Sequence, residues 1–173
     1  MIRQEILEKL APITDEERAI LDGEGVNKSI YTTGGGSVIR HKKLLVDGKL
    51  IHVRTHTRFV HFPEHTHDYI EAVYMCSGQT THLINGKKLI LREGELLFLG
   101  QNARQEILPA GERDIAVNFI IQPSFFDKTL EMLEAEETPI KSFLISSISH
   151  GSASNAIRPP SLSFLPHSLT IWR

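Results

Sequence analysis

Three side chains near the middle of the sequence have the types and the spacing of a metal or ligand site. His65, His67 and Glu71 lie in the stretch FVHFPEHTHDYIEAVYMCSG, two and four residues apart. Side chains of an extended strand alternate between its two faces, so these positions, which share parity, would point the same way from one continuous strand. Two imidazoles and a carboxylate on one face of a sheet can hold a divalent metal ion or fix a polar ligand.

A purely structural role is the alternative, in which the same side chains form a hydrogen-bonded cluster without metal or ligand. A single histidine of this kind is usually structural, whereas three groups that share one face favour a functional site. We therefore expect His65, His67 and Glu71 to bind a ligand.

Other polar side chains could join this site from a neighbouring strand. In the segment from Leu50 to Arg54, His52 and Arg54 alternate with apolar residues, so both could enter the same cavity if their face turns inward. Arg54 could then pair with a carboxylate or phosphate of an effector. The other nearby histidines are mostly expected to face solvent from strand surfaces; they are His56, His61 and His82.

Short strands dominate the sequence from Ser37 to about Ile121. Alternating and β-branched runs predict strands at 38–39, 44–46, 50–54, 57–61, 69–76, 80–84, 89–91, 96–99, 105–108 and 115–121. Asp47-Gly48 and Asn85-Gly86 are hairpin turn signals between some of them. Many short strands with turns between them indicate an all-β sandwich or barrel, and the lack of helical stretches between them disfavours a parallel α/β sheet.

Helical or irregular segments flank the predicted barrel. Near the N-terminus, Thr14 and Glu17 form a capping box for a short helix over 15–21, and a glycine-rich linker follows. A second helix is predicted from Ser124 to Glu134, and the serine-rich tail after it contains no Asp or Glu. We divide the chain into an arm with its linker (1–36), a barrel (37–122), a C-terminal helix (123–137) and an irregular tail (138–173).

Composition excludes several classes of function. The 173 residues carry a net charge of −2, so the basic footprint of a nucleic-acid-binding protein is missing. The sequence contains no run of about 18 apolar residues, which a membrane span would need. The mixed charges of the first ten residues are not those of a signal peptide. A single cysteine, Cys76, favours a reducing compartment. We therefore expect a cytoplasmic protein.

The central motif is similar to one of a known superfamily. Its pattern, H-x-H-x3-E-x6-G, is formed by His65, His67, Glu71 and Gly78. Together with the short strands, it resembles the first motif of the cupin superfamily, over roughly residues 37–121. Phe59 stands where that family usually has glycine. The resemblance implies a double-stranded β-helix, a jelly-roll-like barrel, with an N-terminal helical arm and a C-terminal helix.

The second cupin motif would lie about one hairpin downstream. Its glycine, proline and glycine positions are occupied by Gly94, Gly100 and Asn102, and its ligand histidine aligns with Gln105. If the resemblance extends to a metal, the ligands would be His65, His67, Glu71 and Gln105, and Zn, Ni, Mn or Fe would be the candidate ions. Glutamine is a poor replacement for the fourth ligand, and the effector-sensing branch of the superfamily generally does without a metal.

A narrower resemblance rests on three segments, HTHDYIEAVYMCSG, the hairpin around NGKK, and REGELLFLG. They look like the sensor domain of AraC-type transcription regulators. That resemblance implies a cupin that binds an effector and forms a homodimer, joined to a C-terminal pair of helix-turn-helix units. This chain stops before such a DNA-binding part could fit, so we hypothesise that its tail reflects an early terminus, a truncation or a change of reading frame.

Two functions therefore remain from the sequence. The first is a sensing and dimerisation domain for a small-molecule effector such as a sugar, without catalysis, membrane binding or direct nucleic-acid contact from this chain. The ligand-binding residues would be His65, His67, Glu71, Gln105, His52 and Arg54. The second is a stand-alone metal-dependent cupin enzyme, an isomerase or an oxygenase, in which the two histidines and Glu71 hold a catalytic metal.

Overall fold

A computed structural model describes residues 3–32, 36–101, 103–126, 141–142, 145 and 169–172. Its strands are β1 (Val38–Ile39), β2 (Ile51–Thr55), β3 (Phe62–His67), β4 (Ile70–Ser77), β5 (Gln79–Ile84), β6 (Lys87–Arg92), β7 (Leu96–Leu99), β8 (Gln105–Ile107), β9 (Ile115–Ile121) and β10 (Leu169–Trp172). Its helices are α1 (Gln4–Leu10), α2 (Asp15–Leu21) and α3 (His41–Leu44), with 3-10 turns η1 (Lys28–Ile30) and η2 (Pro123–Phe126).

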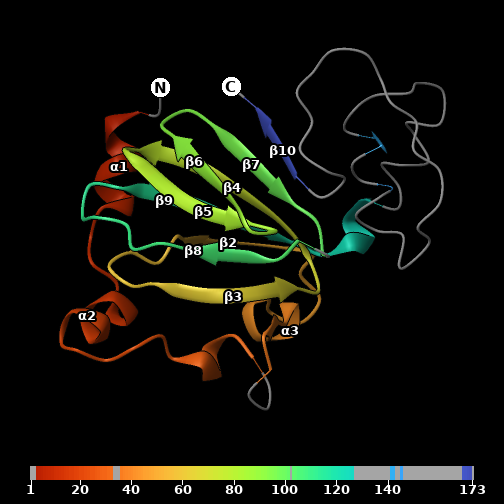
Figure 1. Cartoon of the computed structure of the whole chain (residues 1–173), viewed down its shortest axis with the longest axis horizontal. Helices are drawn as coiled ribbons and strands as arrows, with labels where there is room; N and C mark the ends of the chain where they lie inside the picture. The colour runs from red at the N-terminus through yellow and green to blue at the C-terminus, as the bar shows by residue number, and fades with distance from the viewer. Residues whose placement is uncertain are drawn as a thin grey trace.

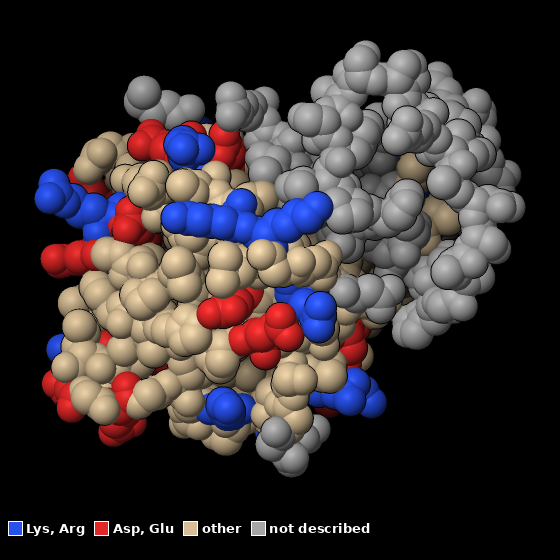
Figure 2. Space-filling model, viewed as in Figure 1, with Lys and Arg blue, Asp and Glu red and all other residues tan. Residues whose placement is uncertain are grey.

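The described strands form two sheets of five, in the orders β1-β3-β8-β5-β6 and β10-β7-β4-β9-β2. Figure 1 shows them rolled into one body with the N-terminal helices at its periphery. All described pairings are antiparallel except that of β1 with β3. On the face seen in Figure 2, acidic and basic side chains lie close to one another.

Apolar side chains from both sheets form the core between them. In β4 the inner face alternates strictly, with Val73 and Met75 in the core and Ala72 and Tyr74 on the outer side. The largest core cluster combines residues of β4, β5, β6, β7 and β9. Each fully buried aliphatic side chain there stabilises the fold by about 1.5–3 kcal/mol. The inner positions at the other end of the barrel carry polar residues, which form the site described below.

Several predicted elements are confirmed. The capping box of α2 is present, since the Thr14 side chain accepts from the Glu17 N–H and the Glu17 carboxylate accepts from the Thr14 N–H. The hairpin between β5 and β6 turns at Asn85 and Gly86, with φ of 50° and 77°. Positive φ at both positions is the signature of the tight turn that Asn-Gly predicts.

Two predicted strands are absent from the positions expected. The segment around Leu44 is the short helix α3, whose His41 N–H donates to the Asp68 carboxylate at 2.6 Å, so Asp47-Gly48 is a turn and not a hairpin. Residues 57–61 are not a strand either. The N–H of Arg58 donates to Glu17, and Phe59 has a φ of 69°, which no extended strand contains.

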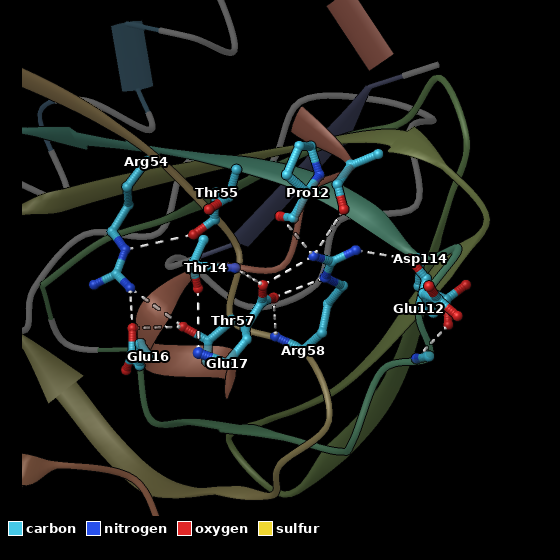
Figure 3. A network of polar contacts seen from close by, with 12 residues as sticks. Pro12, Thr14, Glu16, Glu17, Arg54, Thr55, Thr57, Arg58, Glu112 and Asp114 are labelled. Atoms are coloured by element: carbon cyan, nitrogen blue, oxygen red, sulfur yellow. Dashed lines mark hydrogen bonds and ion pairs between the residues drawn. The ribbon is translucent and has the colours of Figure 1, made fainter. Parts of the chain in front are cut away.

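The arm is fixed to the barrel by a buried ion pair (Figure 3). Arg58 donates to both carboxylate oxygens of Glu17, at 2.7 and 2.8 Å, and both side chains are almost fully buried. The same guanidinium donates to the backbone carbonyls of Ala11, Pro12 and Glu112. Burial raises the pKa of Glu17, but its hydrogen bonds with Arg58 and Thr14 outweigh this and lower it to about 2. The polar groups of this pair are therefore fully satisfied.

The C-terminal part is described only in pieces. The expected helix over 124–134 begins as the 3-10 turn η2, and its remainder lies outside the described residues. Most of the tail that we expected to be irregular also lies outside them, but residues 169–172 form β10, which pairs with β7 from Leu169–Leu99 to Trp172–Leu96. None of the helices in the described ranges has the length and hydrophobicity needed to cross a membrane.

Gly78 provides a test of the fold. Its φ is +73°, and a Cβ atom there would collide with the Asp114 carboxylate, which is held by the N–H groups of Gln79 and Gly111. We expect Gly78→Ala to lower the free energy of unfolding by about 2–4 kcal/mol, from backbone strain and overpacking together. Urea denaturation measures this loss.

Gly86→Ala is the matched control, because Gly86 has a similar φ of +77° but open space around it. It should cost only the backbone strain, about 1 kcal/mol. Equal losses in the two variants would contradict the close contact at Gly78.

Candidate functional site

The chain crosses from one sheet to the other inside the motif. His65 and His67 lie in β3, whereas Glu71 lies in β4 of the opposite sheet. The bend at Asp68 and Tyr69 separates the two strands. The expectation that one continuous strand presents all three side chains is therefore wrong. The groups meet across the barrel, with His67 Nε2 3.7 Å from Glu71 Oε2 and the two histidine rings 5.0 Å apart.

These side chains line a cavity of about 40 Å³ between the sheets. Aromatic and aliphatic groups form part of its wall, including Tyr31, Phe62 and Ile120. Its polar lining comes from several strands and consists of Arg54, His56, Thr57, His65, His67, Glu71 and Asn118. Such a volume holds a few water molecules.

Glu71 is 4% exposed and is only half satisfied. Its Oε1 accepts from Asn118 Nδ2 at 2.9 Å, while its Oε2 has no hydrogen-bond partner among the described residues. Burial raises the pKa of Glu71 to about 7, against the opposing effects of the Asn118 hydrogen bond, of Arg54 and of Gln105. A carboxyl group near neutrality can either accept or donate a hydrogen bond to a ligand.

The histidines of the motif are held in the neutral form. Neither ring nitrogen of His67 has a hydrogen-bond partner within the described parts of the chain, and burial lowers its pKa well below the usual value. His65 donates from Nδ1 to the Pro63 carbonyl at 2.8 Å, and burial lowers its pKa as well. The two rings therefore offer hydrogen-bonding atoms without adding charge.

His56 and Asn118 extend the site. Since Asn118 uses its amide N–H for Glu71, its Oδ1 accepts from His56 Nδ1, 3.1 Å away. The other ring nitrogen of His56, Nε2, then carries a lone pair, and it has no partner among the described residues. Burial lowers the pKa of His56 to about 4, so the ring is neutral.

Gln105 is not among the residues that line the cavity, although it lies close enough to His65 and Glu71 to affect the pKa of both. It pairs in register with His65, and its Nε2 donates to His82 Nδ1 at 3.0 Å, while His82 Nε2 donates to Thr80 Oγ1 at 2.9 Å. Gln105 Oε1 has no partner among the described residues. The structure thus places this predicted ligand-binding residue next to the site, where it orients His82.

Of the two residues predicted on β2, the structure brings one to the cavity. Arg54 lines it, but His52 is half-buried on the same strand face and is not part of the lining. The prediction that His56 and His82 face solvent is wrong, since they are 3% and 0% exposed. His61 is exposed and lies 2.7 Å from Glu106.

The sequence contains signals for two of the cavity residues that were not predicted, His56 and Asn118. His56 has the same parity as His52 and Arg54, so extending the same alternation by one step would have found it. Asn118 is the one polar residue in the apolar strand IAVNFII of β9. The role of Tyr31, which lies outside the barrel strands, had no comparable signal.

Across the described residues, no group of three or more His, Cys, Asp or Glu side chains is arranged to hold an ion. Gln105, which the cupin resemblance puts at the fourth ligand position, is not part of the cavity lining, and its Nε2 donates to His82.

Comparison of the sequence with known protein families identifies the domain. The sequence model of one protein family, the AraC-like ligand binding domain, matches residues 48–144. The chain belongs to this family. The cupin barrel that the resemblance implied is confirmed. A search of curated protein sequences gives no match to this chain.

Solved structures with this fold are remote in sequence. Apo ToxT K231A from Vibrio cholerae strain SCE256 is 13% identical, covering 72% of this chain and 42% of that one, with a TM-score of 0.45. The EutQ protein of Clostridium difficile is 20% identical over 42% and 55% of the two chains, with a TM-score of 0.34. A cupin protein from Bacteroides fragilis is 22% identical over 43% and 67%, with a TM-score of 0.33. The chain thus spans about half the length of the first two.

We expect the buried neutral histidines to make the fold acid-sensitive. Burial lowers the pKa of His56 to about 4 and that of His82 to about 3, from 6.5. Between these values and 6.5 the unfolded chain binds protons that the folded chain does not, so stability is lost as pH falls. Each such histidine contributes a slope of about 1.4 kcal/mol per pH unit.

The free energy of unfolding of the wild type should therefore fall between about pH 6 and pH 4.5. His82→Gln should make this fall less steep by about 1.4 kcal/mol per pH unit, because the titrating side chain is gone. Urea denaturation at several pH values measures it, with the exposed His61→Gln as control. A profile that is as steep in His82→Gln as in His61→Gln would contradict the burial of a neutral His82.

Proposed function

We propose that this domain senses a small polar effector inside the barrel and reports its presence to the DNA-binding part of a transcription regulator. One observation carries the proposal: polar atoms of His56, His67, Glu71 and Gln105 are buried at or beside one cavity and have no hydrogen-bond partner within the part of the chain that the structure describes. A buried polar atom without a partner costs about 1–3 kcal/mol. An effector that makes these hydrogen bonds recovers part of that cost.

The same molecule contains a structural polar cluster for comparison. Glu17 and Arg58 are as deeply buried as Glu71, yet their polar groups are satisfied by each other and by backbone carbonyls. A purely structural cluster in the barrel would be satisfied in the same way. The contrast favours a binding site for the group around His67 and Glu71.

The free atoms are mainly acceptors, which indicates the chemistry of the effector. His56 Nε2 and Gln105 Oε1 are lone-pair acceptors, and Glu71 Oε2 accepts whenever the carboxyl group is ionised. They call for a ligand with O–H or N–H donors, as in a sugar or another small polyhydroxy compound. Because the cavity is small, a whole sugar ring requires the wall formed by Tyr31 and Arg54 to move.

Contacts between the cavity wall and the arm provide a route for the signal. Arg54 and Tyr31 line the cavity and also contact Glu16 of α2. Occupancy that changes this wall would favour one arrangement of the arm. We propose that the domain works as a homodimer and is not an enzyme, so that this rearrangement, rather than turnover, is its output.

Thermal-shift screening of small polar metabolites tests the function. A true effector should raise the Tm of the wild-type protein and be recovered unchanged. Glu71→Gln should lower its affinity at least tenfold, because the amide oxygen would accept from Asn118 and leave an NH2 donor where Oε2 accepted from the ligand. Glu106→Gln, a substitution of the same kind on the outer side of β8, is the control. Turnover of the bound compound, or equal affinity in both variants, would contradict the proposal.

We further propose that the site works without a metal. After dialysis against a chelator, elemental analysis should find well below one equivalent of Zn, Ni, Mn or Fe per chain. Adding each ion back should leave the Tm unchanged, since no group of three or more His, Cys, Asp or Glu side chains in the described parts of the chain is arranged to hold an ion. Retention of one equivalent would instead support the metal-dependent cupin enzyme.

A further inference from the structure

The cavity wall contains a carboxylate that belongs to the protein itself. Glu16 of α2 accepts from Arg54 Nη2 at 2.7 Å and from the Tyr31 hydroxyl at 2.5 Å, and Thr57 Oγ1 lies 3.5 Å from it. Figure 3 shows Glu16 reaching from the arm toward Arg54 and Thr57. The three donors all come from residues that line the cavity, whereas Glu16 comes from the arm.

The donors fit a carboxylate closely. Arg54 lies over the ring of Tyr31 at 5.1 Å, and its Nη2 also donates to Thr57 Oγ1 at 3.2 Å, so the guanidinium is held in place. Burial would lower the pKa of Arg54, but Tyr31 and Glu16 beside it raise that pKa, so the guanidinium stays charged. A charged, oriented guanidinium with two hydroxyl groups forms a binding site for a carboxylate.

We propose that Glu16 occupies the carboxylate subsite of the effector, and that a small hydroxy acid or amino acid binds by displacing it from Arg54, Tyr31 and Thr57. This inference rests on the proposed function and specifies its ligand and its signal. The carboxylate of the effector takes the place of the Glu16 carboxylate. Its hydroxyl or ammonium group donates to the free acceptors on the side of Glu71 and His56.

Charge balance favours this exchange over the binding of a neutral ligand at the same place. Arg54 faces Glu16 and Tyr31 directly, and Glu71 lies close enough for Arg54 to lower its pKa. Replacing one carboxylate by another leaves Arg54 with a counter-ion throughout. A neutral ligand that displaced Glu16 would leave a partly buried guanidinium unpaired, which is unfavourable.

The exchange would free Glu16 without detaching the arm. The next residue, Glu17, remains bound to Arg58 in the buried pair, so α2 keeps its anchor. Only the side chain of Glu16, which is 14% exposed, and its contacts with the wall would change. The arm would thus respond to the ligand through one side chain beside a fixed point.

Isothermal titration with lactate, propionate and lactamide tests the inference. Lactate has both a carboxylate and a hydroxyl group, propionate lacks the hydroxyl group, and lactamide lacks the carboxylate. We expect lactate to bind more tightly than either. Glu16→Gln should strengthen lactate binding at least fivefold, because the competing carboxylate is gone, and should leave lactamide binding unchanged.

Asp15→Asn is the matched control, since it removes one negative charge from the exposed side of the same helical turn. It should leave lactate affinity within twofold of the wild type. Glu16→Ala provides a second variant if Glu16→Gln does not fold, and the thermal melt of each variant is recorded first. Equal effects of Glu16→Gln and Asp15→Asn would overturn the inference, because general electrostatics would explain both.

The experiments distinguish a failure of the carboxylate subsite from a failure of the proposed sensor function. If a neutral polyol binds with an affinity that Glu71→Gln lowers and Glu16→Gln does not alter, the sensor function stands and the carboxylate subsite is overturned. If no compound binds to the wild type or to either Glu16 variant, both are overturned.

Discussion

Burial of polar atoms without partners is the constraint on which the rest of this structure depends. His67 and Glu71 face each other from opposite sheets, and the nearest approach of their polar atoms is 3.7 Å, too long for a hydrogen bond. Two sheets rich in aliphatic residues would gain stability by filling this space with hydrocarbon. They keep a polar cavity instead, which is the arrangement expected where binding opposes maximal stability.

The surrounding scaffold compensates for this cavity. The cluster that contains Val73, Met75 and Leu97 closes one end of the barrel, and a second cluster that contains Tyr69 and Ile120 packs beside the site. The pair of Glu17 and Arg58 ties the arm to the barrel at the same time. In the proposed sensor, a rigid frame around this cavity would let small side-chain movements, such as those of Glu16 or Arg54, transmit the presence of the ligand.

Much of the fold followed from the sequence, because local patterns determine it. Strands β7 and β9, the hairpin at Asn85-Gly86 and the capping box of α2 all depend on neighbours in the chain. The sequence pattern also indicates the motif of His65, His67 and Glu71, but it does not predict how these side chains are arranged. Parity arguments hold within one strand, and the bend at Asp68 and Tyr69 transfers the chain to the other sheet, so that spacing alone no longer defines direction.

The remaining differences arise from contacts between distant residues. Asp68 accepts from the first N–H group of α3, and Glu17 accepts from the N–H of Arg58, so both segments depart from the expected strands. Phe59, at the position where the cupin family usually has glycine, adopts a left-handed backbone, which the family pattern implies but local propensity opposes. Burial of His82 depends on Gln105, which lies 23 residues away.

The free energy of unfolding of ligand-free His67→Phe tests the central claim most directly. Both ring nitrogens of His67 are unpartnered among the described residues, so an apolar ring should remove a cost without removing a hydrogen bond. The account predicts a protein that is more stable than the wild type by about 1 kcal/mol or more. A variant with equal or lower stability would show that His67 supports the fold, and would contradict the binding cavity proposed for this barrel.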